Sequence, residues 1–91
     1  MSLESQHDQK VRRIAAGYLG MGYSVRADLP DWERPKPIRR RIPDVVAVRG
    51  KTTKIVEVET DSTQRSHRDQ RAIFKDYALG RRRTRFRWTR A

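Results

Sequence analysis

The stretch that most limits the fold is residues 42–60, Ile-Pro-Asp-Val-Val-Ala-Val-Arg-Gly-Lys-Thr-Thr-Lys-Ile-Val-Glu-Val-Glu-Thr. Two runs rich in β-branched residues, 45–48 and 55–58, flank a glycine turn, so composition and spacing predict a β-hairpin. A two-residue turn and a four-residue loop give the same register of paired residues. In that register Asp44 lies directly opposite Glu57.

This register places acidic side chains inside an apolar strand pair. Asp44 and Glu57 share one face with Glu59, because alternate residues of a strand point the same way. Directly opposed residues have Cβ atoms about 4.5–5.5 Å apart, where like charges repel. A divalent cation fits between them, since Mg²⁺ takes one or two carboxylates together with waters and phosphate. The alternatives are a solvated strand end neutralised by Arg39–Arg41 or Lys54, or a β-bulge that breaks the register.

The spacing of the acidic residues also matches a known motif. Pro43-Asp44 is followed, after twelve residues, by Glu57-Val58-Glu59 in an apolar strand. This pattern resembles the PD-(D/E)xK nuclease superfamily, whose restriction-endonuclease-like fold occurs in archaeal Holliday-junction resolvases and RecB-type nucleases. Asp44 and Glu57 match its two acidic positions. Glu59 stands where the family normally has lysine, as glutamate does in some restriction enzymes of the superfamily.

The resemblance implies a DNA endonuclease that depends on Mg²⁺ or Mn²⁺ and hydrolyses phosphodiester bonds. Asp44, Glu57 and the backbone carbonyl of Val58 would bind the ion, which would polarise the scissile phosphate. Glu59 cannot supply the positive charge of a lysine, so it would act as a further ligand or as a general base. The resemblance also implies a homodimer, although no pattern in the sequence identifies a dimer surface. The absent lysine leaves an alternative open, a catalytically impaired nucleic-acid-binding module of the same fold.

The charge of the chain independently predicts a polyanionic partner. Lys and Arg number 22 against 11 Asp and Glu, a net charge of +11. Nucleic acid is the first candidate, because neutralising phosphates releases counterions. An RNA-binding or ribosome-associated protein would share this balance, as would a protein at an anionic membrane surface, but paired strand carboxylates would serve no purpose in the former.

The first helical pattern covers residues 5–20. A capping box at Ser5–Asp8 opens it, and glycines close it. An acid on the first helix often helps to hold the metal in the resembling family, so Asp8 or Glu4 is a candidate ligand, with His7 as a rival. Asp8 also has a simpler role as part of the helix cap. The apolar positions of this helix are Val11, Ile14, Ala15, Tyr18 and Leu19.

A strand is predicted over residues 23–29, where apolar and polar residues alternate up to Pro30. Residues 31–41 contain two prolines, a tryptophan and four arginines, which indicates a loop. Three of those arginines directly precede the Asp44 strand, so the loop is expected either to bind phosphate or to be a solvated connector. The candidate phosphate contacts are Arg39, Arg40 and Arg41.

Residues 61–65 read as a polar link, and a second capping box at Ser66–Asp69 leads into a helix that ends at Leu79. Gln70 lies one turn before Phe74 on the apolar stripe and should point toward the sheet. This pair resembles the glutamine-containing helix of RecB-type nucleases, which implies that Gln70 orients a water or a phosphate. The stripe itself consists of Ile73, Phe74, Tyr77 and Ala78.

A last strand is predicted within residues 81–90, where Arg85 and Arg87 share one face and Phe86 and Trp88 the other. The arginines are candidate phosphate contacts, or charges that protect an edge strand from aggregation. The order helix, three strands, helix, strand predicts an α/β three-layer sandwich with a mixed central sheet. This is the minimal αβββαβ restriction-endonuclease-like core.

Length and composition complete the expectations. The chain of 91 residues is expected to form one nuclease-like domain over residues 1–91. Cysteine is absent, which fits a reducing compartment and excludes thiolate metal ligands. No apolar run reaches the length of a membrane span or of a signal-peptide core. A soluble cytoplasmic protein is therefore expected, with DNA rather than a membrane as its partner.

Overall fold

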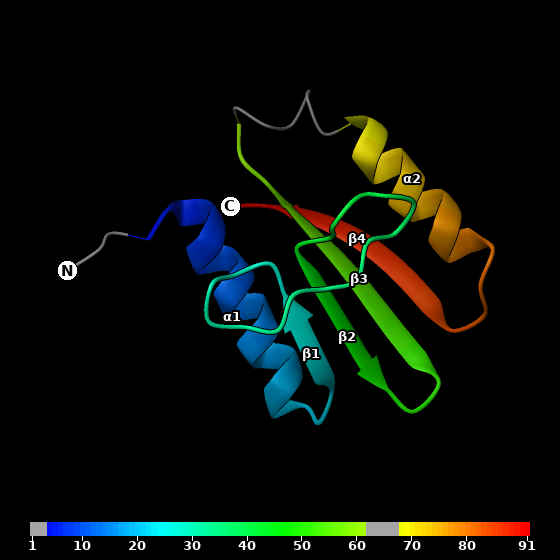
Figure 1. The fold of residues 1–91 in the computed structure, drawn as a ribbon, viewed down its shortest axis with the longest axis horizontal. Coiled ribbons are helices and arrows are strands. Elements are labelled where there is room, and N and C mark those ends of the chain that lie inside the picture. Colours follow the sequence, from blue (N-terminus) through cyan, green and yellow to red (C-terminus); the bar gives the residue numbers. More distant parts are fainter. Residues whose placement is uncertain (1–3, 62–67) are drawn as a thin grey trace.

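The computed structural model describes residues 4–61 and 68–91. Its strands form one mixed sheet in the order β1-β2-β3-β4, with β1, β2 and β3 antiparallel and β4 parallel to β3 (Figure 1). This arrangement confirms the predicted α/β class and the order of the elements. The elements are α1 (Gln6–Gly20), β1 (Ser24–Ala27), β2 (Val45–Arg49), β3 (Thr52–Glu59), α2 (Arg68–Leu79) and β4 (Thr84–Arg90).

The central hairpin has the predicted register. Arg49 pairs with Thr52, so the connection is the two-residue turn of Gly50 and Lys51. Gly50 has a φ of 58°, a left-handed conformation that glycine adopts without steric cost. The pairing continues along the hairpin to Val45, which lies opposite Val56.

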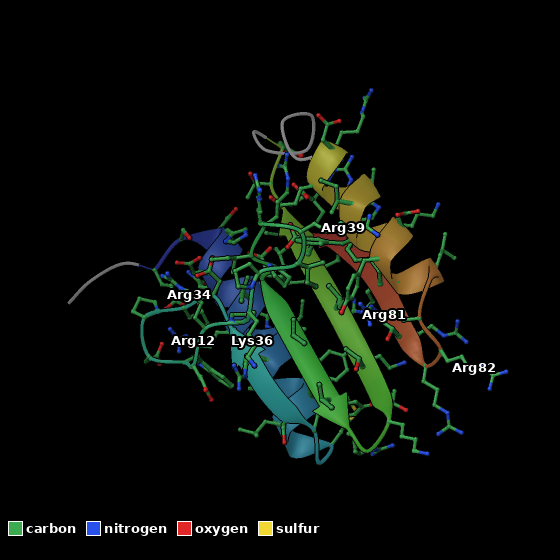
Figure 2. All side chains as sticks on the ribbon, turned by 45° about the vertical axis from the view of Figure 1, so that its right-hand side comes forward. Arg12, Arg34, Lys36, Arg39, Arg81 and Arg82 are labelled. Carbon is green, nitrogen blue, oxygen red and sulfur yellow. The ribbon has the colours of Figure 1, made fainter. Side chains whose placement is uncertain are left out.

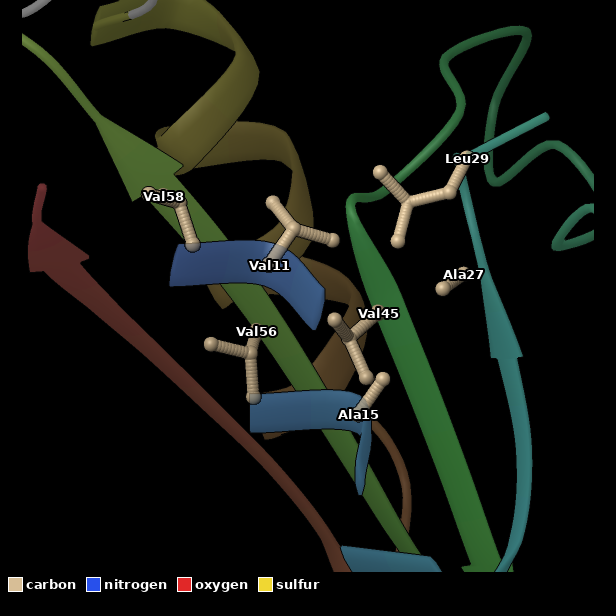
Figure 3. Packing of buried hydrophobic residues seen from close by; sticks show 7 residues of the cluster. All are labelled: Val11, Ala15, Ala27, Leu29, Val45, Val56 and Val58. Carbon is tan, nitrogen blue, oxygen red and sulfur yellow. The ribbon is translucent and has the colours of Figure 1, made fainter. Parts of the chain in front are cut away.

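Helix α1 covers one face of the sheet. It begins at Ser5, whose Oγ accepts the Asp8 backbone N–H at 3.1 Å and so satisfies one of the free donors of the first turn. Its fully buried Val11 and Ala15 pack on the strands, as Figure 3 shows. The cluster of buried residues on this face is Val11, Ala15, Ala27, Leu29, Val45, Val56 and Val58.

Helix α2 covers the opposite face. Val56 and Val58 of β3 face α1, so the alternate residues Ile55 and Glu57 face the other way. The Phe74 ring of α2 lies 6.1 Å from the Phe86 ring of β4, between centroids, and α2 is seen behind the strands in Figure 3. The sheet is therefore the middle of three layers. The expected link at 61–65 lies mostly outside the described residues, as does the start of the capping box at Ser66.

Strand β1 is shorter than the predicted 23–29. The backbone N–H of Leu29 turns back to the Ala27 carbonyl at 2.9 Å, which ends the extended conformation just before Pro30. The predicted loop follows, and its Trp32 packs on the core beneath α1. Among the described residues, no helix is both long and apolar enough to cross a membrane.

The loop contains a small hairpin that the sequence did not predict. Ile38 and Arg41 exchange two backbone hydrogen bonds of 2.8 and 3.0 Å, and Arg39 and Arg40 between them have φ of 50° and 71°. Two positive φ angles define a type I′ turn, which normally selects Asn-Gly. The Arg39 guanidinium contacts the Asp76 carboxylate at 2.7 Å, so the hairpin reaches α2 across the sheet (Figure 2).

Candidate functional site

Asp44 and Glu57 lie together where β2 begins and β3 nears its end. The backbone N–H of Asp44 donates to Glu57 Oε1 at 2.9 Å, and the backbone N–H of Val58 donates to Asp44 Oδ2 at 2.8 Å. Only 9% of Asp44 and 1% of Glu57 are exposed. The two predicted acids are thus joined through reciprocal bonds between one side chain and the other strand's backbone.

Gln70 holds the second oxygen of Glu57. It lies in the first turn of α2, and its Nε2 donates to Glu57 Oε2 at 2.7 Å. The apolar stripe of α2 brings it there, because Phe74, one turn later, is fully buried against the sheet. The structure therefore places Gln70 beside the carboxylate pair, as its position on the stripe predicted.

The first turn of α1 also reaches the pair, through His7 rather than through an acid. His7 Nε2 lies 3.3 Å from Asp44 Oδ2, and His7 Nδ1 lies 2.9 Å from Asp8 Oδ1. The hydrogen bond to Asp44 raises the pKa of His7 to about 9, although burial works in the opposite direction. Asp8 thus contacts the site only by way of His7, and Glu4 instead binds Arg12 at 2.8 Å.

Glu59 shares the face of Glu57 and has no exposed surface. The guanidinium of Arg71 lies 3.6 Å from Glu59 Oε1 and stacks on the Trp88 ring at 4.7 Å from its centroid. Sequence reasoning missed Arg71, because it falls outside the apolar stripe of α2. The only signal was its position next to Gln70. Arg71 brings a positive charge to the acid that stands at the family's lysine position.

Burial and charge repulsion act on Glu57 together. Burial, and after it the negative charge of Asp44, raises the pKa of Glu57 to about 8, against the hydrogen bonds from the Asp44 N–H and Gln70. A cation next to both carboxylates would relieve this unfavourable charge. Two carboxylates are also the donor set that Mg²⁺ commonly accepts, with waters and phosphate as the remaining ligands.

Few described side chains at this site could bind a metal ion in addition to Asp44 and Glu57. Within residues 4–61 and 68–91, no three or more His, Asp or Glu side chains converge in a way that could hold a metal. The predicted addition of Asp8 to the pair is therefore not seen, since its carboxylate bonds to His7. An ion at this site would rely on Asp44 and Glu57 with a non-carboxylate ligand such as the predicted Val58 carbonyl.

The predicted phosphate contacts fall on two different surfaces. Arg40 and Arg41 are exposed beside Arg39, in the hairpin that crosses the α2 face of the sheet. Arg85 and Arg87 are exposed as well, but they alternate with Phe86, which faces α2. They therefore point to the α1 side of β4, away from Glu57.

No family model and no curated protein matches the chain.

Proposed function

We propose that the chain is a metal-dependent DNA endonuclease with the restriction-endonuclease-like fold of the PD-(D/E)xK superfamily. The observation that carries this proposal is the buried pair Asp44 and Glu57, which are joined by hydrogen bonds across two strands. Gln70 donates a further hydrogen bond to Glu57. Burying two adjacent carboxylates is costly unless a cation or a proton is shared between them. The order of helices and strands, with a parallel last strand, supports the same fold.

Each residue of the site has a role in this proposal. Asp44 and Glu57, with the Val58 carbonyl, would hold Mg²⁺ or Mn²⁺, which when bound supplies charge neutralisation at the scissile phosphate. Gln70 fixes the Glu57 carboxylate through its 2.7 Å hydrogen bond. Glu59 has no exposed surface, so we propose that it positions Arg71 and does not contact an attacking water. Arg71 then supplies the positive charge that lysine supplies in the family.

The second candidate is a nucleic-acid-binding module that does not cleave. His7 favours it, because a cationic imidazole at Asp44 Oδ2 already neutralises the carboxylate that would bind the ion. In this case the pair of acids, His7 and Gln70 would form a polar network at the end of the sheet. The net charge of +11 would still attract nucleic acid.

Cleavage assays separate the two candidates. Single-stranded, duplex and branched DNA are incubated with Mg²⁺ or Mn²⁺ and with wild-type protein, Asp44→Asn or Asp31→Asn. Asp31 is an exposed carboxylate bound to Arg12, so its variant is the matched control. We expect cleavage to fall more than about 100-fold in Asp44→Asn, beyond the loss typical of residues that only support a metal ligand, and to persist in Asp31→Asn.

Ion binding is measured in the same proteins by thermal unfolding. Mg²⁺ or Mn²⁺ should raise the unfolding temperature of wild type and Asp31→Asn but not of Asp44→Asn, because a ligand stabilises only the state that binds it. Cleavage that is unchanged in Asp44→Asn would refute the assigned site. Salt-sensitive binding without cleavage of any substrate by wild type would establish the non-cleaving module.

A further inference from the structure

The α2 face of the sheet contains a groove beside the acidic pair. Helix α2 packs mainly on β4, and among the described residues the same face of β1 and β2 is lined by the loop that precedes β2 and by Tyr77 of α2. A groove of about 600 Å³ lies there, within the range of sites for small ligands. Its apolar lining comes from Val46, Val48 and Ile55 of the sheet, Ile38 of the loop and Tyr77 of α2.

A second, basic pocket adjoins this groove. It measures about 410 Å³ and is lined by Arg39, Tyr77, Gly80 and Arg81. Tyr77 lines both cavities, and the Arg81 guanidinium stacks on its ring at 4.2 Å from the centroid. Lys36, Arg39 and Arg81 border this region in Figure 2.

The charge of the lining favours an anionic ligand. Among the described residues that line the two cavities, four are cationic and one, Glu33, carries a carboxylate, which pairs with Arg26 at 3.4 Å. Arg39 is oriented by Asp76, and Arg81 by the Tyr77 ring. The groove thus has an apolar floor with Arg26 and Lys36 among its lining residues, and the basic pocket adds Arg39 and Arg81. Together they suit a ligand with a flat apolar body and an attached anion. The four cations are Arg26, Lys36, Arg39 and Arg81.

The groove and the acidic pair lie along the same strand, β3. Ile55 of its floor precedes Glu57 by two residues on the same face, about 7 Å along the strand. A chain of nucleotides that runs along this face would pass both places.

We propose that the groove receives one unpaired base of a nucleic-acid strand, and that the basic pocket holds the phosphate attached to it. The base would lie against the Tyr77 ring and the valine floor, where stacking is tolerant of sequence. That the strand is the DNA to be cleaved rests on the proposed function. The substrates would then be strands with an unpaired nucleotide beside the scissile phosphate, such as flaps, frayed ends or branches.

Binding of two probes of equal charge tests this proposal. Fluorescence anisotropy compares a labelled oligothymidylate with an abasic oligomer of the same length, in EDTA so that no cleavage takes place. Wild type should bind the oligothymidylate about tenfold more tightly, within the range of aromatic–base stacking. Tyr77→Ala should remove this preference, whereas Tyr77→Phe, which keeps the ring, should retain it. Leu79→Ala, an exposed neighbour on α2, is the matched control and should also retain it.

A second variant keeps the test independent of Tyr77. Val48 is 39% exposed at the end of β2, so Val48→Lys places a long side chain in the groove without disturbing the core. It adds a positive charge, yet it should lose the preference for bases. Equal binding of both probes by wild type would overturn the proposal, as would a preference that survives both Tyr77→Ala and Val48→Lys.

Two further outcomes show whether the groove assignment or the nuclease proposal is wrong. Trp88 is another exposed ring, stacked on Arg71, so a preference that is lost only in Trp88→Ala would move the base to that site and overturn the groove assignment. Because the probes are bound without a divalent ion, base preference in a protein that cleaves nothing would refute the nuclease and leave the groove in place. Cleavage without base preference would refute the groove assignment and leave the nuclease proposal in place.

Discussion

Asp44 and Glu57 each accept a backbone N–H from the opposite strand, and these bonds fix both carboxylates at the cost of burying them. Water no longer solvates the charges, and each carboxylate repels the other. The surrounding groups offset part of this cost, since His7 donates to Asp44 and Gln70 to Glu57. A purely structural role could be filled by apolar residues without any of these costs, and for this reason we attach the function to these side chains.

The first prediction concerns pH and the metal-free protein. Folding raises the pKa of Glu57 from 4.5 to about 8, so its contribution to stability is greatest below pH 4.5 and declines up to about pH 8. Folding raises the pKa of His7 from 6.5 to about 9, so its contribution is complete below pH 6.5 and is lost through about pH 9. Both act in the same direction. The free energy of unfolding in EDTA should therefore fall by more than about 1 kcal/mol between about pH 6 and pH 9. This threshold is smaller than the free energy that corresponds to a shift of one pKa unit.

Urea denaturation at the two pH values measures this change. Glu57→Gln cannot ionise and should show a smaller decline, whereas the exposed Asp31→Asn should behave like wild type. A metal-free protein whose stability rises over this interval would contradict the assignment of both groups.

The second prediction concerns the left-handed arginines. Arg40 has a φ of 71°, which costs a non-glycine residue about 1 kcal/mol, and glycine avoids this steric cost. Arg40→Gly should therefore raise the free energy of unfolding by up to about 1 kcal/mol while it weakens DNA binding. Arg83→Gly relieves the same conformation at φ 58° before β4 and is the matched control. Destabilisation by Arg40→Gly would show that the side chain, and not the backbone, dominates at this turn.

At the scale of elements, both helices bring a polar side chain from their first turn to the same pair of strands. α1 supplies His7 and α2 supplies Gln70, from opposite faces of the sheet. The apolar stripe of each helix determines this placement, so the geometry of the site depends on packing at some distance from it. Phe74 is the largest fully buried side chain in the described parts of the chain, and it anchors α2 one turn after Gln70.

The third prediction follows from that anchor. Phe74→Ala should lower the free energy of unfolding by about 3–5 kcal/mol, a large share of the 5–15 kcal/mol typical of a domain. Leu79→Ala removes an apolar side chain from the same helix, but Leu79 is 77% exposed, so its effect should stay within about 0.5 kcal/mol. Thermal and urea unfolding of the three proteins measure the difference. Equal effects would mean that α2 is not held to the sheet by Phe74.

The sequence predicted what depends on local chemistry. The register of the central hairpin follows from strand composition around Gly50, and the facing of Gln70 follows from helical spacing. It offered His7 only as a rival of Asp8 and Glu4, because the angle of α1 decides which of them reaches Asp44. It missed Arg71, which lies outside the apolar stripe of α2. The turn at 39–40 was missed because neither glycine nor asparagine occupies it.

At the scale of the molecule, the excess of positive charge is divided between the two faces. The acidic pair, the groove and the hairpin of Arg39–Arg41 share the α2 face. Arg85 and Arg87 lie on the α1 face of the edge strand β4. A nucleic acid that contacts the acidic pair can therefore meet the hairpin directly, whereas it reaches Arg85 and Arg87 only by bending around the edge.

The last prediction uses this division. Each phosphate contact contributes about 0.9 to the slope of log K against log salt concentration on duplex DNA. The double variant Arg40→Gln/Arg41→Gln should therefore reduce the slope by about 2, measured by anisotropy between about 50 and 200 mM salt. Arg85→Gln/Arg87→Gln removes the same charge from the other face and should reduce it by less than about 1. Equal reductions would contradict binding to one face and would mean that the nucleic acid wraps around β4, while a larger effect of the second pair would place the binding surface on the α1 side.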